Sequence, residues 1–217
     1  MGNLFDTYKQ NQSLKTKVAD LSSSKNNQES LEVENKELKE ALKLQETLTD
    51  YKTISANVIT RNPASWADTL VIDSGSKQGI KNRQLVMANG GVIGRVSQVN
   101  ENSSKVSLLS SDKGIDAKIP VRLGSPSDPV NGLLTSYDND QDAYVVTSLV
   151  GEGNIEKGSQ VVTSGLGGDS PRGLLIGTVI EVKETDQGLN RKVYVKPASN
   201  LYDIRFVFAI QGMIGGN

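Results

Sequence analysis

The apolar positions in the first 52 residues follow the spacing of a coiled-coil helix. Steps of three and four residues alternate along two heptad series, as they do at positions a and d of a coiled coil. We assign position a to Gln28, Asn35, Leu42 and Thr49, and position d to Leu31, Leu38 and Gln45. Residues 4–52 contain no glycine or proline, so nothing in them interrupts a helix. The pattern predicts a helical stalk over residues 1–52.

The stalk is expected to form a homodimer through these seam residues. Asn35 at an a position favours a parallel dimer, because its amide is satisfied by the same residue of the partner helix. Several other seam positions are also polar, so the seam is expected to be weak. A serine run at residues 22–24 interrupts the heptad phase upstream. The alternative is a single helix that packs on its own globular part.

From residue 53 onward the period of the pattern changes to two, which is typical of β-strands. Nearly all the glycines and all six prolines lie in this part, where they separate short apolar segments. Twelve strands are expected, at residues 54–60, 66–73, 84–88, 92–99, 104–110, 115–122, 131–136, 143–149, 159–164, 174–183, 191–197 and 204–211. Regular short strands with glycine turns indicate a mainly β fold, here two small six-stranded β-barrels that follow the stalk.

An internal echo supports two related β units. The segment from Ile93 to Val99 aligns with the segment from Ile176 to Val182, and each contains glycine as its second residue. Glycine inside a strand pattern indicates a bulge or a sharp bend. We expect a first barrel at residues 53–137 and a second at 138–217, with the boundary in the acidic turn near Tyr137. The C-terminal strands could instead return to the first barrel, which would make that barrel discontinuous.

The composition argues against most catalytic chemistry. Histidine and cysteine are both absent, so the chain has no imidazole base, no thiolate nucleophile and no Cys or His zinc site. Basic and acidic residues are balanced, at 24 and 25, and no segment has the basic excess that nucleic-acid binding needs. We therefore expect no enzymatic activity, no cofactor, no metal and no nucleic-acid partner.

Four motifs could still indicate chemistry, and each has a simpler interpretation. The acidic segment from Tyr137 to Ala143 resembles the start of a calcium loop, but Ala143 stands where an EF-hand needs glycine. The glycines at 165, 167 and 168 lack the Lys-Ser/Thr pair of a phosphate loop. Ser-x-x-Lys sequences are common by chance, and no pair of carboxylates is singled out for glycoside hydrolysis. Turns and surface charge explain these motifs better.

Several stretches follow one another in a distinctive order. They are Gly75-Ser76-Lys77-Gln78-Gly79-Ile80, Gly91-Val92-Ile93-Gly94-Arg95-Val96, Val161-Val162-Thr163-Ser164-Gly165-Leu166-Gly167-Gly168, Pro171-Arg172-Gly173-Leu174 and Ile176-Gly177-Thr178-Val179. Together with Val195-Lys196-Pro197-Ala198 and the preceding coiled coil, they resemble the rod shape-determining protein MreC family, from about residue 31 to 211. The resemblance singles out the motif glycines Gly79, Gly91, Gly94, Gly165, Gly167, Gly168, Gly173 and Gly177.

The resemblance implies a dimeric scaffold of the bacterial cell-wall elongation machinery, which supports rod or cell shape. It implies contacts with penicillin-binding proteins and MreD, and an indirect link to MreB. Family members are anchored to the cell membrane by an N-terminal helix and hold two β-barrels outside it. This sequence lacks such a helix, so we expect an extracytoplasmic part of a longer, membrane-anchored protein. The alternatives are a periplasmic adaptor of an export complex and a carboxylate-based hydrolase.

Overall fold

The structure is a computed structural model, and it describes residues 51–61, 68–111, 118–125, 128–151, 153–166, 170–185 and 190–213. The coiled-coil seam expected at residues 28–49 lies outside the described residues. Within the described ranges, no helix is both long enough and apolar enough to cross a membrane.

Each of the twelve expected strands is present. They are β1 (Tyr51–Arg61), β2 (Thr69–Ile72), β3 (Leu85–Ala88), β4 (Gly91–Val99), β5 (Ser104–Leu108), β6 (Ile119–Ser125), β7 (Asp128–Asp138), β8 (Ala143–Val150), β9 (Gln160–Thr163), β10 (Leu175–Thr185), β11 (Asn190–Pro197) and β12 (Phe206–Met213). The short 3-10 helix η2 (Ser76–Gln78) was not expected, and it ends at Gly79, which has a left-handed conformation. The alternation of apolar and polar residues was therefore sufficient to locate the strands.

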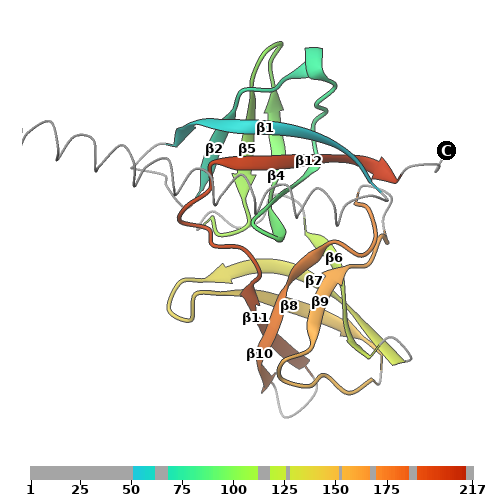
Figure 1. Cartoon of the computed structure of the whole chain (residues 1–217). Helices are drawn as coiled ribbons and strands as arrows, with labels where there is room; N and C mark the ends of the chain where they lie inside the picture. The colour runs from blue at the N-terminus through green and yellow to red at the C-terminus, as the bar shows by residue number, and fades with distance from the viewer. Residues whose placement is uncertain are drawn as a thin grey trace, which may run out of the picture. The chain divides into compact units, whose positions relative to one another are not determined.

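The strands form two closed antiparallel barrels of six strands each, as predicted (Figure 1). The first ring runs β1-β12-β3-β4-β5-β2, and the second runs β10-β11-β8-β7-β6-β9. Figure 1 shows the red β12 beside the cyan β1 in the same barrel. The C-terminal strand thus belongs to the first barrel, although the whole of the second barrel precedes it in the sequence.

The expected boundary at Tyr137 is corrected by this topology. Both β6 and β7 belong to the second barrel, so the chain enters that barrel at Ile119. The first barrel consists of β1 to β5 together with β12, and its residues are not contiguous. The acidic turn after Tyr137 is a hairpin within the second barrel, between β7 and β8. A turn-rich acidic segment marks an exposed connection, but a hairpin within a domain needs such a segment as much as a linker does.

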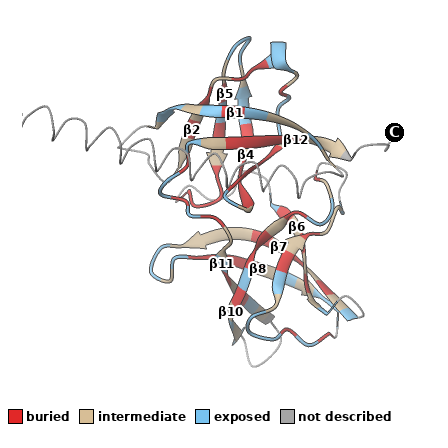
Figure 2. Cartoon of the chain, viewed as in Figure 1, coloured by how far each residue is buried: buried red, intermediate tan, exposed pale blue. Residues whose placement is uncertain are grey.

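Each barrel has an apolar interior (Figure 2). In the first barrel the largest fully buried side chains include Leu70, Ile72, Leu85, Ile93 and Leu108. In the second barrel the interior includes Ile119, Leu123, Leu134, Tyr144 and Ile176. Full burial of such a side chain contributes about 1.5–3 kcal/mol, so the closed rings are held together mainly by their interiors. Tyr144 is fully buried, and the burial raises the pKa of its hydroxyl, so it stays neutral.

Two of the motif glycines lie at close approaches between neighbouring strands. A Cβ atom on Gly94 of β4 would lie 2.4 Å from the carbonyl oxygen of Ser107 in β5, and one on Gly177 of β10 would lie 2.0 Å from that of Lys196 in β11. The pairing register also shifts next to Gly177, between Leu175 and Gly177. Glycine inside these strands therefore marks bulges, as the sequence pattern indicated.

Candidate docking surface

The closed rings restrict how the barrels can bind another protein. Every described strand is paired on both sides within its ring, so neither barrel offers a free strand edge among these residues. A partner strand that adds to a sheet edge therefore has no place to pair on the described part of either barrel. A partner of the described part must therefore contact side chains on the outside of the barrels or on their connections.

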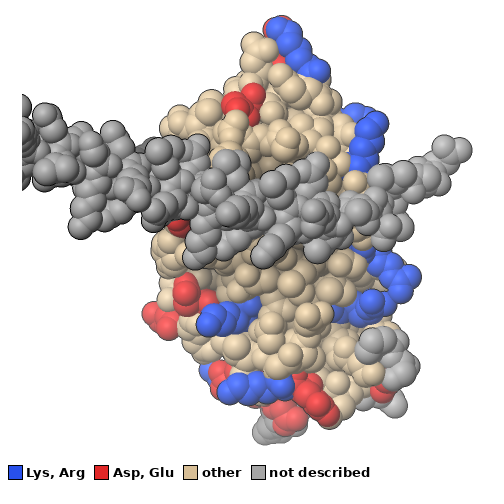
Figure 3. All heavy atoms as spheres, in the orientation of Figure 1, with Lys and Arg blue, Asp and Glu red and all other residues tan. Residues whose placement is uncertain are grey.

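Four large apolar side chains are exposed on the described surface. They are Ile59 at 56%, Tyr202 at 65%, Leu166 at 57% and Val150 at 70% of their full exposure. Figure 3 shows one face of the molecule, where charged groups of both signs are separated by uncharged surface. Single exposed apolar residues are ordinary, so a docking surface requires them to be grouped by the fold.

One of the four, Tyr202, lies in the segment that joins the barrels, and another, Ile59, lies on β1 two residues before Arg61, which is bonded to that segment. Residues 198–205 connect β11 of the second barrel to β12 of the first, and we call them the crossing segment. Arg61 lies two residues beyond Ile59 on β1, and its guanidinium donates to the carbonyl oxygens of Leu201 and Tyr202, at 2.5 and 3.0 Å. Burial lowers the pKa of Arg61, and the nearby charge of Asp203 partly offsets this effect.

Two further side-chain contacts hold the crossing segment on the first barrel. The hydroxyl of Ser199 donates to the carbonyl oxygen of Ala88, and the side-chain amide of Asn89 donates to that of Asp203 at 3.1 Å. Ser199 is buried, whereas Tyr202 and Asp203 face solvent. The segment is therefore fixed at its backbone while the ring of Tyr202 stays exposed.

The acidic hairpin of the second barrel reaches the same segment. The Tyr202 hydroxyl donates to Oδ1 of Asp142 at 3.4 Å, and the Tyr137 hydroxyl donates to the same oxygen. Partial burial raises the pKa of Tyr137, and the hydrogen bond to Asp142 adds to the shift. The Tyr137 ring packs edge-on against Tyr144, with ring centroids 5.6 Å apart. We define Ile59, Arg61, Asp142 and Tyr202 as the crossing surface.

The hairpin has no sign of a calcium site. Asp138 Oδ1 accepts the backbone N–H groups of Asp140 and Gln141, at 3.0 and 3.1 Å, which is the arrangement of an Asx turn. Among the described residues, no group of three or more Asp or Glu is placed to hold a metal ion. The turn interpretation of this motif is therefore the better one.

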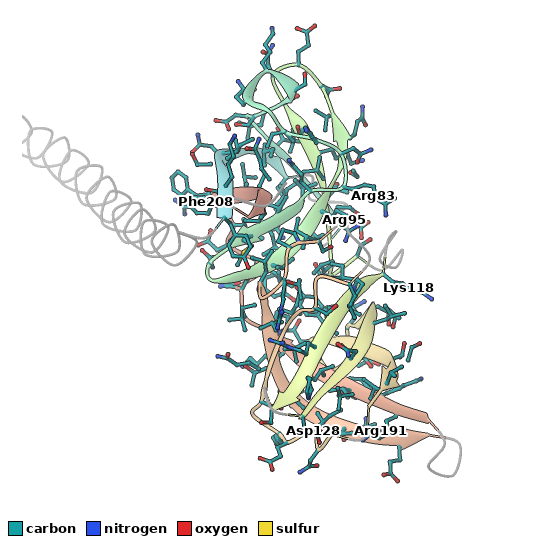
Figure 4. The ribbon with its side chains drawn as sticks, turned by 90° about the vertical axis from the view of Figure 1, so that its right-hand side faces the viewer. Arg83, Arg95, Lys118, Asp128, Arg191 and Phe208 are labelled. Carbon is teal, nitrogen blue, oxygen red and sulfur yellow. The ribbon has the colours of Figure 1, made fainter. Side chains whose placement is uncertain are left out.

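The described part of the glycine-rich loop after β9 joins the two barrels. Arg95 of β4, labelled in Figure 4, donates to the Ser170 hydroxyl at 3.0 Å, and the Tyr51 hydroxyl of β1 donates to the carbonyl oxygen of Arg172. Below the loop, the buried Thr163 hydroxyl donates to the Pro171 carbonyl at 2.5 Å. These residues make structural contacts between barrels, and none of these contacts forms a cradle of N–H groups for phosphate.

The motif glycines do not gather in one site. Gly79, Gly165 and Gly173 have positive φ angles; Gly79 ends η2, whereas Gly165 and Gly173 both lie in the connection between β9 and β10. A Cβ placed on Gly91, at the start of β4, would lie within 3 Å of the side chains of Ala198 and Ser199. Gly94 and Gly177 lie at the strand approaches described above. Gly167 and Gly168 lie outside the described residues, as do the seam residues of the stalk. The crossing surface shares no residue with this set, and sequence reasoning did not single it out.

The chain is similar to known proteins of one family. The family model for the barrel core of rod shape-determining protein MreC matches residues 58–211. A cell shape-determining protein MreC from Listeria monocytogenes is 34% identical over 209 residues, which cover 96% of this chain and 70% of that protein. The solved structure of MreC from Listeria has a TM-score of 0.70 and covers 93% of this chain and 95% of its own.

Two other solved structures bear on function. The first is the major periplasmic domain of a protein described as the cell shape-determining filament MreC. It is 33% identical, has a TM-score of 0.66, and covers 73% of this chain and 97% of its own. The barrels here thus correspond to the periplasmic domain of that protein.

The second is a complex between penicillin-binding protein PBP2 and MreC from Helicobacter pylori. It shares the fold at 17% identity and a TM-score of 0.55, and covers 74% of this chain and 99% of its own. The chain therefore belongs to the rod shape-determining protein MreC family, which are non-catalytic cell shape-determining proteins.

Proposed function

We propose that the chain is a dimeric scaffold outside the bacterial membrane, which organises cell-wall elongation by binding peptidoglycan synthases of the penicillin-binding protein class. The observation that supports it most directly is the crossing surface, where the exposed ring of Tyr202 stands on a segment that is fixed between two closed barrels and Ile59 is exposed on β1, two residues from Arg61. In the H. pylori structure, an MreC with the same fold forms a complex with penicillin-binding protein PBP2. A membrane anchor preceding this sequence, contacts with MreD and an indirect link to MreB belong to the same proposal.

The crossing surface has the properties of a small binding hot spot. Ile59 and Tyr202 are more than half exposed, so burying the exposed part of either side chain contributes about 1–2 kcal/mol. Tyrosine and arginine are enriched at hot spots, because they combine apolar area with a polar group. The bonds from Arg61 to the crossing segment order the backbone before binding, which lowers the entropy lost on association. A partner with an apolar patch beside a basic group would suit Tyr202 and Asp142.

Ile59→Asp is expected to weaken binding of a penicillin-binding protein ectodomain from the same bacterium. Removing the apolar contact and placing a charge in the interface should cost about 2 kcal/mol, which corresponds to an increase in Kd of about 30-fold. Surface plasmon resonance with the immobilised full chain measures the change. Because Ile59 is exposed, far-UV circular dichroism of the variant should match that of the original chain.

Val150→Asp is the control, because it introduces the same charge at a still more exposed apolar residue on β8, outside the crossing surface. Its Kd should change by less than threefold. Equal Kd values for both variants and the original chain would remove the crossing surface from the proposal. Absence of binding by the original chain would remove the synthase-binding role itself.

Leu38→Asp is expected to convert a dimer into a monomer in sedimentation equilibrium. Leu38 is a predicted d position of the stalk, and a charge buried in the seam costs several kcal/mol. Lys36→Asp is the control, because the same heptad assignment puts Lys36 at position b, away from the seam. Pairing would double the synthase sites, so weak contacts would gain avidity. An unchanged mass for Leu38→Asp would show that the dimer does not depend on the proposed seam.

A further inference from the structure

The two barrels have the same arrangement of strands around their rings. Strands β1 to β5 correspond in order to β7 to β11, because each strand has the equivalent neighbours in its own ring. One place in each ring is left over, between the first and third strands of the set. In the first barrel β12 fills it, between β1 and β3, and in the second barrel β6 fills it, between β7 and β9.

The correspondence extends to individual hydrogen bonds. The N–H of Arg83 donates to the Val96 carbonyl at 2.8 Å, and the N–H of Gly158 donates to the Val179 carbonyl at 2.8 Å. Arg83 and Gly158 both have positive φ angles, of 69° and 94°. The register shifts just after Val96 and just after Val179, where β4 and β10 pair with their next strands. The barrels are therefore two copies of one five-strand unit, each completed by a sixth strand.

The sixth place receives its strand from opposite directions in the two barrels. In the second barrel β6 precedes the unit and joins it through a tight hairpin, in which Ser125 pairs with Asp128. In the first barrel β12 follows the other barrel and arrives through the crossing segment. Met213, the last residue of β12, pairs with Tyr51, the first residue of β1. The start of β1 and the end of β12 thus lie side by side where the equivalent hairpin would turn.

The place between β1 and β3 holds β12 through backbone pairing and through the burial of its apolar side chains. β12 pairs with β1 at seven positions, from Tyr51 with Met213 to Asn57 with Phe206. Val207, Ala209 and Ile210 are buried, and so is Phe208, which Figure 4 labels on the first barrel. At the far end, the side-chain amide of Gln211 donates to the Gly79 carbonyl at 2.9 Å. All these contacts are made by the strand itself, and none requires the connection that delivers it.

We propose that the position between β1 and β3 is a strand-acceptor site, which takes the β12 strand of a second copy of this chain as well as its own. A second copy is the fitting partner because its strand has the same register and the same buried residues. In the second barrel the equivalent place is filled by β6, which precedes its unit in the sequence, whereas β12 follows the other barrel. The place therefore needs a strand of suitable sequence, and it does not need a particular connection to that strand. Exchange of β12 would link two copies through their first barrels.

The first experiment cleaves the crossing segment and supplies the β12 strand as a separate peptide. A protease recognition sequence is inserted between Tyr202 and Asp203 of the full chain, which are both exposed. The folded protein is cleaved, unfolded in urea and refolded with a tenfold excess of a fluorescent peptide of residues 203–213. The refolded chain should retain the peptide in gel filtration, at least tenfold more than a peptide with Val207→Asp and Ala209→Asp. Loss of the fold on cleavage, or equal capture of both peptides, would overturn the proposal.

The second experiment asks whether a second copy supplies the strand. One full chain has a defective strand, with Val207→Asp and Ala209→Asp, and the other has a defective acceptor, with Ala56→Asp on β1 opposite Val207. Both also have Leu38→Asp, so that stalk pairing does not contribute. Co-refolding should give a hetero-pair with one restored first barrel, whereas neither chain alone should pair. Capture of the peptide without any hetero-pair would overturn exchange between copies. Neither experiment depends on synthase binding.

Discussion

Gly177→Ala is expected to destabilise the second barrel by at least about 3 kcal/mol, because the new Cβ would lie 2.0 Å from the Lys196 carbonyl oxygen. That carbonyl belongs to β11, which pairs with β10 along its whole length, so it cannot move without disturbing the ladder. The nearest carbon of the same residue would be only 2.9 Å away. Urea unfolding of the full chain, followed by far-UV circular dichroism, should show a lower midpoint or a partly unfolded chain without urea.

Gly90→Ala is the matched control for this effect. Gly90 has a φ angle of 90°, and no atom lies within 4 Å of a Cβ placed there. Its cost should be only the left-handed backbone strain of about 1–2 kcal/mol. Gly94→Ala should resemble Gly177→Ala but act in the first barrel, because its Cβ would lie 2.4 Å from the Ser107 carbonyl oxygen. If Gly177→Ala lowers the free energy of unfolding by no more than Gly90→Ala does, β10 and β11 do not approach as closely at Gly177 as described.

Gly94 and Gly177 show what the local sequence can specify. The pattern from Ile93 to Val99 repeats from Ile176 to Val182, and that repeat was enough to predict paired units with a bulge at the glycine. Strand positions were also predictable, because a half-buried strand alternates residue by residue. Both features depend only on neighbours along the chain. They hold whichever strands later close each ring.

The closure of the rings could not be predicted in the same way. β6 alternates apolar and polar residues, whereas β12 starts with a continuous apolar run, and nothing within either strand states which barrel it enters. That choice depends on pairing between residues far apart in sequence, such as Ala56 with Val207. The acidic turn after Tyr137 looked like a boundary because exposed connections share one composition. The sequence therefore supported a boundary at a position that the ring topology excludes.

The crossing surface could not be predicted from the sequence for a related reason. Ile59 follows Val58 on β1, where the pairing with β2 shifts its register, and Tyr202 lies in a short connection of mixed polarity. Their importance comes from exposure and from the bonds of Arg61, which appear only once β1 and the crossing segment are adjacent. A useful signal was the sequence from Asn200 to Asp203, where Leu201 and Tyr202 stand between two polar residues in a predicted connection. An aromatic ring in such a segment more often faces solvent than one within a strand.

Thr163→Val is expected to destabilise the second barrel by about 2–4 kcal/mol, because it removes one hydroxyl that satisfies two buried backbone groups. Thr163 is fully buried at the end of β9. Its Oγ1 accepts the Leu174 N–H at 2.9 Å and donates to the Pro171 carbonyl at 2.5 Å. Valine has nearly the same shape, so it would leave both groups unpaired without opening a cavity. Urea unfolding measures the change in free energy.

The same substitution should also loosen the contact between the barrels, because the Thr163 hydroxyl anchors the loop that holds Ser170 and Arg172. Hydrogen–deuterium exchange of residues 170–174 should increase before global unfolding, since fewer bonds hold the loop down. Thr163→Ser keeps the hydroxyl and should restore most of the stability, whereas Thr178→Val, at an exposed position on β10, should change it by less than about 0.5 kcal/mol. If Thr163→Val unfolds at the same urea concentration as the original chain while Thr163→Ser is destabilised, the packing of the methyl group and not the hydroxyl holds the loop.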